Sequence, residues 1–156
     1  MKQQCYMAAI YFTWALYLGG LAYLAYQSRW PLAAFWLIGV PTLEWIYIRK
    51  FPSLSKAMGY GPIADQPGET TSAAHVKVTL YTAIGCPFCP LIESRLRELQ
   101  RQMGFSLETI DVTLRPDILA SKGIRSVPVV ETRGRFLTGL VSTKDLSTAI
   151  GAANPA

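Results

Sequence analysis

Two cysteines three positions apart, Cys86 and Cys89, are the residues of this chain best suited to chemistry. They directly follow a β-branched stretch and precede a stretch with helical spacing. A helix N-terminus presents unpaired N–H groups and the positive end of the helix dipole, so it stabilises a thiolate and lowers the pKa of a cysteine. Because the thiolate attacks disulfides, we expect Cys86 to be the nucleophile and Cys89 the resolving thiol. Pro87 and Phe88, between them, fix the turn and help to set the redox poise.

The cysteine pair could also serve other functions. A zinc site needs four ligands, and only Cys5 and His75 remain, both outside the stretch that holds the pair. An iron–sulfur cluster bridging two subunits, a carrier of metal or mercuric ions and a docking domain without redox activity stay open as alternatives. We expect no metal and no bound cofactor. Cys5 stands alone in the sequence, and His75 is expected to be solvated.

The residues around the pair predict an α/β domain. Alternation, helical spacing and turn residues predict its elements in the order β-α-β-α-β-β-α. The expected strands are 76–82, 106–112, 127–132 and about 135–137, and the expected helices are 87–103, 116–122 and 142–150. The first crossover predicts a parallel pair and the last two strands a hairpin, so helices should cover both faces of a four-stranded mixed sheet.

The segment 76–150 resembles the thioredoxin superfamily in its small, glutaredoxin-sized form. Its motif Cys86-Pro87-Phe88-Cys89 resembles the glutaredoxin motif Cys-Pro-Tyr-Cys, with Phe in place of Tyr. With the proline that follows, it also resembles small archaeal thioredoxin-like proteins and protein disulfide oxidoreductases. The resemblance implies a thioredoxin-like fold, and it places Pro87 and Phe88 at the substrate-binding surface.

A second match is the stretch 123–128, which ends in Val127-Pro128. In the family this position holds a cis-proline loop that faces the active-site cysteines. The resemblance therefore implies that Val127-Pro128 is cis and that the backbone of Val127 pairs with the substrate chain.

Two features depart from the family pattern. Gly85 stands where thioredoxins have Trp, and residues 139–145 replace the Gly-Gly and acidic pattern with which glutaredoxins bind glutathione. Glutathione as co-substrate and a flavoenzyme resembling thioredoxin reductase are therefore both open as electron sources.

The first third of the chain has a different composition from the domain. Hydrophobic residues make up 51% of the chain and charged residues 16%, and residues 3–28 carry no charge. At about 1.5 Å per residue, this stretch can cross a hydrocarbon core of about 30 Å. We predict a transmembrane hairpin within residues 1–50, with spans at about 5–27 and 30–48, the second kinked at Pro41. A cleaved signal peptide is the alternative, but no good cleavage site follows the first span.

Charges at the ends of the spans predict the orientation of the hairpin. Lys2, Arg49, Lys50 and Lys56 lie on one side and Arg29 on the other. Both termini and the domain should therefore lie in the cytoplasm of a bacterium, at its inner membrane. Glu44 lies inside the second span. Its carboxylate either reaches headgroups or the nearby cations, or contacts a partner helix.

These observations predict a membrane-anchored thiol–disulfide oxidoreductase. Residues 51–75 are expected to be a flexible linker and residues 76–156 the redox domain. Its partners would be membrane lipid and the cysteines or disulfides of other proteins. The alternative is an accessory or assembly subunit that joins a larger membrane complex through the hairpin and Glu44. A net charge of +5 without a basic run gives no support to nucleic-acid binding.

Overall fold

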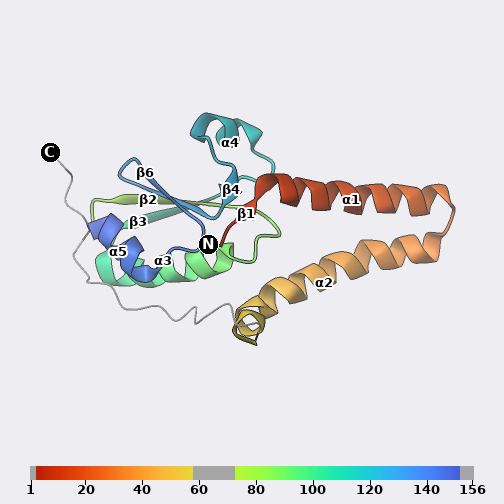
Figure 1. Ribbon diagram of the computed structural model, residues 1–156, viewed down its shortest axis with the longest axis horizontal. Helices are drawn as coiled ribbons and strands as arrows, with labels where there is room; N and C mark the ends of the chain where they lie inside the picture. Colours follow the sequence, from red (N-terminus) through yellow and green to blue (C-terminus); the bar gives the residue numbers. More distant parts are fainter. Residues whose placement is uncertain (1–2, 58–72, 152–156) are drawn as a thin grey trace.

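The computed structural model describes residues 3–57 and 73–151. A helical hairpin projects from one end of an α/β domain (Figure 1). The helices are α1 (Met7–Tyr26), α2 (Trp30–Ala57), α3 (Cys89–Met103), α4 (Pro116–Lys122) and α5 (Thr143–Gly151). The strands are β1 (Cys5–Tyr6), β2 (Lys77–Thr82), β3 (Ser106–Asp111), β4 (Ser126–Val127), β5 (Val129–Thr132) and β6 (Arg135–Thr138). The predicted order of helices and strands in the domain is confirmed.

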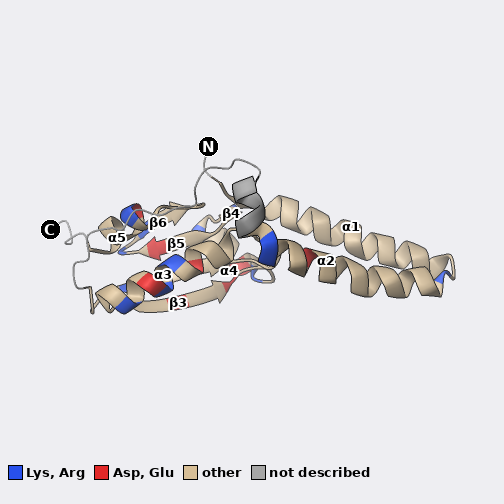
Figure 2. Cartoon of the chain, turned by 90° about the horizontal axis from the view of Figure 1, so that it is seen from below, with Lys and Arg blue, Asp and Glu red and all other residues tan. Residues whose placement is uncertain are grey.

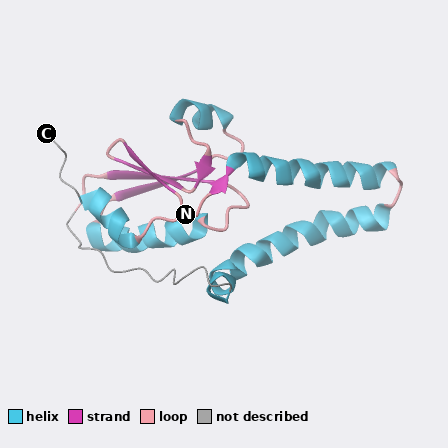
Figure 3. Cartoon of the chain, viewed as in Figure 1, coloured by secondary structure: helices cyan, strands magenta, loops and turns pink. Residues whose placement is uncertain are grey.

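The domain is built on a four-stranded mixed sheet, as the sequence predicts. Its strands lie in the order β3-β2-β5-β6, with β2 parallel to β3 and the other pairs antiparallel (Figure 3). Leu80, in the central strand β2, faces Thr109 of β3 and Val130 of β5. The third predicted strand is divided at Pro128 into β4 and β5, and β4 pairs with β1 rather than with the main sheet.

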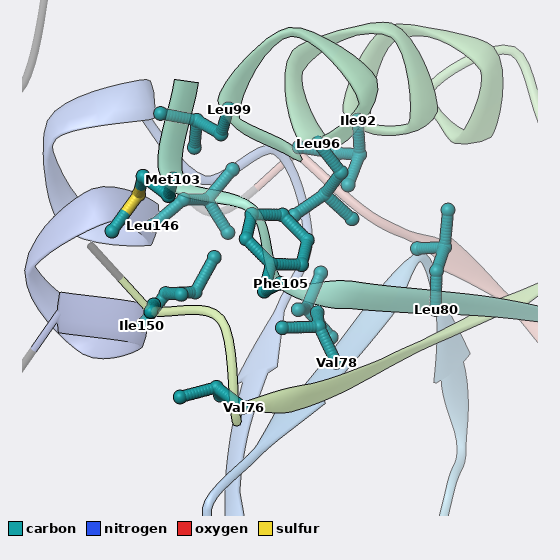
Figure 4. Close-up of a cluster of buried hydrophobic side chains, with 12 residues drawn as sticks. Val76, Val78, Leu80, Ile92, Leu96, Leu99, Met103, Phe105, Leu146 and Ile150 are labelled. Atoms are coloured by element: carbon teal, nitrogen blue, oxygen red, sulfur yellow. The ribbon is translucent and has the colours of Figure 1, made fainter. Parts of the chain in front are cut away.

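Helices cover both faces of this sheet (Figure 1). The helix α3 buries one stripe of side chains spaced by three and four residues, which is the amphipathic pattern of a surface helix. Together with α5 it forms the main core against the sheet (Figure 4). The fully or almost fully buried side chains of this core include Val78, Leu80, Ile92, Leu96, Leu99, Met103, Phe105, Val130, Leu146 and Ile150. On the other face, Ile118 and Leu119 of α4 pack against a second cluster, which also holds the cysteine pair.

The hairpin helices contact each other through a few specific groups. The indole N–H of Trp36 donates to the Tyr17 carbonyl at 3.2 Å, and its ring packs against Gly20. In return, the Tyr17 hydroxyl donates to the carbonyl of Leu37 at 3.2 Å. That carbonyl lies four residues before Pro41, which has no N–H to donate to it. Tyr17 therefore satisfies the acceptor that the proline leaves free.

The surface of the hairpin is apolar along most of its length. Charged residues occur only near its two ends, with Arg29 at the turn and Glu44, Arg49 and Lys50 toward the domain (Figure 2). Large apolar side chains are widely exposed on both helices. Both helices are long and apolar enough to cross a membrane, and only 6% of each apolar stretch is buried.

The second helix is longer than predicted. It continues to Ala57, whereas the sequence places its end near residue 48. The residues that follow Ile48 are more polar than those before it. This change in composition marks a change of surroundings rather than the end of the helix. Most of the predicted linker, residues 58–72, lies outside the described residues.

Candidate functional site

The two cysteines of the pair lie at the junction of β2 and α3. Cys86 belongs to the loop 83–88, called here the cysteine loop, and Cys89 is the first residue of α3. The backbone N–H of Cys86 donates to Ala83 and that of Cys89 donates to Cys86, at 3.2 and 3.4 Å. The helix begins two residues later than predicted. Cys86 therefore precedes the helix N-terminus.

The proline loop lies beside the cysteines, as the resemblance implies. The Val127-Pro128 peptide bond is cis, which confirms that expectation. Val127 is fully buried and shares the second apolar cluster with both cysteines. The role of Val127 in binding substrate stays a prediction.

Cys5 is the functional candidate that the sequence did not reveal. The antiparallel pairing of β1 with β4 sets Cys5 opposite Val127. From there it packs against the apolar cluster that holds Cys86 and Cys89, and its thiol interacts with that of Cys86. The interpretation of Cys5 as an isolated residue outside the domain was wrong. No spacing rule signals a contact between residues 5 and 86, because strand pairing brings them together.

The surroundings of Cys86 change its acidity in the direction opposite to the prediction. The Cys5 thiol donates to the Cys86 sulfur, which favours the thiolate. Three effects outweigh it: the hydrogen bond from Cys86 to Cys89, burial to 2% exposure and repulsion by a Cys89 thiolate. Together they raise the pKa of Cys86 to about 12. The hydrogen bond to Cys86 and burial also raise the pKa of Cys5.

The first helix of the hairpin packs on the same site. Met7 and Ile10 are buried in the cluster that holds the cysteine pair. The Tyr11 hydroxyl donates to the carbonyl of Thr113 at 3.0 Å, and the hydroxyl of Thr113 accepts from the N–H of Ile84 at 2.8 Å. Thr113 therefore connects the cysteine loop to α1. Its part in the site could not be inferred from the sequence, because residue 113 lies in a turn.

The second helix contacts the site at two points. The Phe51 ring meets Phe88 edge to face, with 5.2 Å between ring centres. Glu44 points at Gly85, where an added Cβ would lie 2.7 Å from its Oε1. Neither sequence interpretation of Glu44 anticipated that the carboxylate contacts the cysteine loop of its own chain. Gly85 also has a φ of +87°. Both the Glu44 contact and this backbone conformation therefore disfavour a side chain at position 85.

A cavity of about 350 Å³ lies between the hairpin and the cysteine loop. Cys5, Glu44 and Gly85 contribute to its lining, which is otherwise mainly apolar. Cys86 and Cys89 do not line it. Among the described residues, no group of three or more His, Cys, Asp or Glu side chains could hold a metal ion. His75 is exposed.

Residues 77–151 match the family model described as Glutaredoxin-like domain (DUF836). The solved structure of a mutant thioredoxin from Halobacterium salinarum NRC-1 is similar, with 26% identity, 55% of this chain and 83% of that chain covered, and a TM-score of 0.44. No curated protein matches the chain. The match and the order of elements support a thioredoxin-superfamily domain at residues 77–151, with a thioredoxin-like α/β fold. The resemblance to the thioredoxin superfamily is therefore confirmed for this domain.

Proposed function

We propose that the protein is a thiol–disulfide oxidoreductase anchored to a membrane by its helical hairpin. The observation that carries this proposal is the arrangement of Cys86 before α3, Cys89 as its first residue and the cis-proline loop beside them, within a glutaredoxin-like domain. Such a domain supports thiol redox chemistry in general. The substrate, the electron donor and the direction of transfer belong to the proposal.

The reaction needs only the two cysteines and a partner disulfide. The Cys86 thiolate attacks one sulfur of the partner, forms a mixed disulfide and expels the other sulfur as a thiolate. Cys89 then attacks the Cys86 sulfur, releases the second partner thiol and leaves a Cys86–Cys89 disulfide. The partner is reduced by two electrons, and the dithiol of the domain is oxidised by two. Reduction by glutathione or by a flavoenzyme would complete the cycle.

The membrane anchor is proposed from the exposure of the hairpin. In water, large exposed apolar patches are unusual and mark contacts with membranes or other proteins. A core helix of a soluble protein would be mostly buried, whereas these two helices are not. We propose that lipid covers them, that both termini face the cytoplasm of a bacterium and that the enzyme works as a reductase there, since thiols are kept reduced in that compartment.

Mixed-disulfide trapping with the full-length protein in detergent tests this function. The reduced protein is mixed with a disulfide-containing protein, and free thiols of the substrate are followed over time. We expect wild type to reduce the substrate, Cys86→Ser to lose this activity and the double variant Cys5→Ser/Cys89→Ser to accumulate a covalent complex through Cys86. Undiminished activity of the Cys86→Ser variant would contradict the proposal.

A second candidate is an accessory subunit of a larger membrane complex. One face of α1 supports it, because Gly19 has no atom within 4 Å of an added Cβ, whereas neighbouring Gly20 is covered by Trp36. Small residues on an open face let a further helix approach closely. Purification in mild detergent separates the candidates, since a lone species of 17.2 kDa would count against a stable complex.

A further inference from the structure

The N-terminal segment, residues 3–6, lies on the domain as a short strand beside the cis-proline loop. Three contacts hold it there. The strand β1 pairs with β4, the N–H of Leu140 donates to the carbonyl of Gln3 at 2.7 Å, and the N–H of Met7 donates to the carbonyl of Arg125 at 3.0 Å. The chain itself therefore occupies the backbone edge of Val127.

Cys5 is the residue of this strand that faces the cysteine pair. It stands opposite Val127 and packs against the cluster that holds Cys86 and Cys89. Its neighbour Gln4 points elsewhere, since its Cβ lies 3.5 Å from the position that a Cβ at Gly139 would take. This alternation is that of an extended strand, in which successive side chains point to opposite sides. The strand thus presents one thiol to Cys86 in a fixed register.

The three thiols differ in their solvent exposure. Cys86 and Cys89 are 2% and 4% exposed, whereas Cys5 is partly exposed and lines the cavity between the hairpin and the cysteine loop. A thiol or disulfide that enters this cavity meets the sulfur of Cys5 before that of Cys86. The contacts of β1 therefore set Cys5 between the buried pair and the cavity.

We propose that Cys5 is a third redox-active cysteine, which exchanges a disulfide with Cys86 while the N-terminal strand is seated as an internal substrate. The inference rests on the proposed function. After the pair has been oxidised, the Cys5 sulfur attacks the Cys86 sulfur, the Cys86–Cys89 bond breaks and a Cys5–Cys86 disulfide forms. Cys89 takes up the proton that Cys5 loses. No further oxidant is needed, because one disulfide replaces another.

The test uses the full-length Cys89→Ser variant in detergent, which cannot form the Cys86–Cys89 disulfide. The reduced variant receives one equivalent of dithiodipyridine, a small-molecule disulfide. The more accessible Cys5 first forms a mixed disulfide with one half of the reagent, and Cys86 then displaces that half. After acid quench, alkylation and trypsin digestion, we expect loss of both free thiols and a disulfide linking peptides 3–29 and 78–95. A reagent adduct that persists on either Cys5 or Cys86, with the other thiol free, would overturn the proposal.

The matched control moves the thiol by one residue along the same strand. It combines Gln4→Cys and Cys5→Ser with Cys89→Ser, so its thiol should point toward Gly139 rather than toward Cys86. We expect this control to keep the reagent adduct on one of its two cysteines and to form no linked peptide. Equal formation of the linked peptide in the control would also overturn the proposal, because it would show that position in the strand does not matter.

Wild type provides the second measurement, independent of any substitution at Cys89. After oxidation, a fraction of the molecules should carry the linked peptides with Cys89 alkylated, and complete absence of this species would contradict the role of Cys5. Failure of the proposed function has a different signature, in which wild type forms no Cys86–Cys89 disulfide either. The two failures are therefore distinguishable in one digest.

Discussion

At Cys86, two neighbouring thiols act in opposite directions. Cys5 donates a hydrogen bond to its sulfur and favours the thiolate, while the bond to Cys89 and burial favour the protonated form. The protonated form prevails in the described arrangement, with a pKa of about 12. Since β1 and the first turn of α1 cover the site, removing them would end the burial that raises the pKa of Cys86 but would also remove the Cys5 hydrogen bond that lowers it.

A second titratable cluster joins three elements of the domain. The Tyr81 hydroxyl of β2 donates to Glu131 of β5 at 2.6 Å, and Lys122 at the end of α4 donates to the same carboxylate at 2.8 Å. Burial alone would raise the pKa of Glu131, but Lys122 and Tyr81 together lower it. Burial and Glu131 also raise the pKa of Tyr81 to about 12.

Glu131→Gln should make the domain less stable at neutral pH and less sensitive to acid. A carboxyl whose pKa is lowered by folding stabilises the fold above its unfolded value and loses this contribution as pH falls through the folded value. The loss at pH 7 should be about 1.5–3 kcal/mol, as for hydrogen bonds to a charged group. Thermal unfolding at pH 7 and at about pH 3, below the usual carboxyl pKa, measures the difference, which should shrink in acid.

Glu98→Gln is the control for that variant. Glu98 also pairs with a cation on the same domain, but its side chain is 51% exposed. Exposed pairs contribute about 0–1 kcal/mol, so this variant should unfold almost like wild type at both pH values. An equal pH dependence in both variants would contradict the role given to Glu131.

At the scale of elements, the sequence predicts the domain well because its signals are local. β-Branched alternation gives β2, the spacing of Ile92, Leu96 and Leu99 gives α3, and a left-handed Gly104 ends it. The cysteine pair and the cis-proline loop carry motifs that can be recognised directly. These features depend on neighbours within a few residues, so one sequence is enough to find them.

The remainder depends on contacts between distant segments. The two-residue strand β1 is too short for any pattern, and its pairing with β4 joins residues separated by most of the chain. The contact of Cys5 with Cys86 follows from that pairing. The same pairing helps to bury Cys86, and this burial raises the pKa that the helix N-terminus was expected to lower. The predicted lowering of the Cys86 pKa was wrong because it considered α3 alone.

Gly139→Ala should release the N-terminal strand and activate Cys86. An added Cβ would lie 2.9 Å from the Gln3 carbonyl oxygen, which is closer than real Cβ contacts allow. Displacement of residues 3–5 would expose Cys86 to the reagent. We therefore expect faster alkylation of Cys86 at neutral pH than in wild type, measured by mass spectrometry of the peptide 78–95.

Gly134→Ala separates this effect from backbone strain. Gly134 has a φ of +73°, similar to the +87° of Gly139, but an added Cβ there meets no atom within 4 Å. Both substitutions strain a left-handed backbone position, yet only one touches the N-terminal segment. If both variants accelerate Cys86 alkylation equally, strain rather than release of β1 would be responsible.

At the scale of the whole molecule, the hairpin is attached to the domain on both of its helices. The first turn of α1 is buried in the domain, and Phe51 of α2 packs on Phe88. Beyond this buried turn, exposed apolar side chains continue from Tyr11 and Phe12 to Tyr26 at the hairpin turn. The domain should therefore sit against the membrane surface.

The proposed topology places the hairpin turn on the far side of the membrane from the domain. In a background with all three cysteines replaced by Ser, Ser28→Cys should react with a membrane-impermeant maleimide in cells whose outer membrane has been made permeable. Ser28 lies in the hairpin turn with a φ of 54°. It is exposed there, so a cysteine at this position is accessible to the reagent. Labelling only after lysis would contradict the orientation.

Ser121→Cys in the same background is the matched control. Ser121 is an exposed residue of α4 in the domain, so it should react only after the inner membrane is opened. A reversed pattern, with Ser121→Cys labelled from outside and Ser28→Cys protected, would place the domain in the periplasm and favour an oxidase or isomerase.

The most direct test of the redox function is an equilibrium redox titration of the full-length protein in detergent. Samples are equilibrated in dithiothreitol buffers of different oxidised-to-reduced ratio, acid-quenched, alkylated and analysed by mass spectrometry. We expect a disulfide between Cys86 and Cys89 to form and disappear reversibly, with a two-electron slope of about 30 mV per tenfold change in ratio. If both sulfurs remain free thiols across the whole range, the cysteine pair is not a redox centre and the proposed function is contradicted.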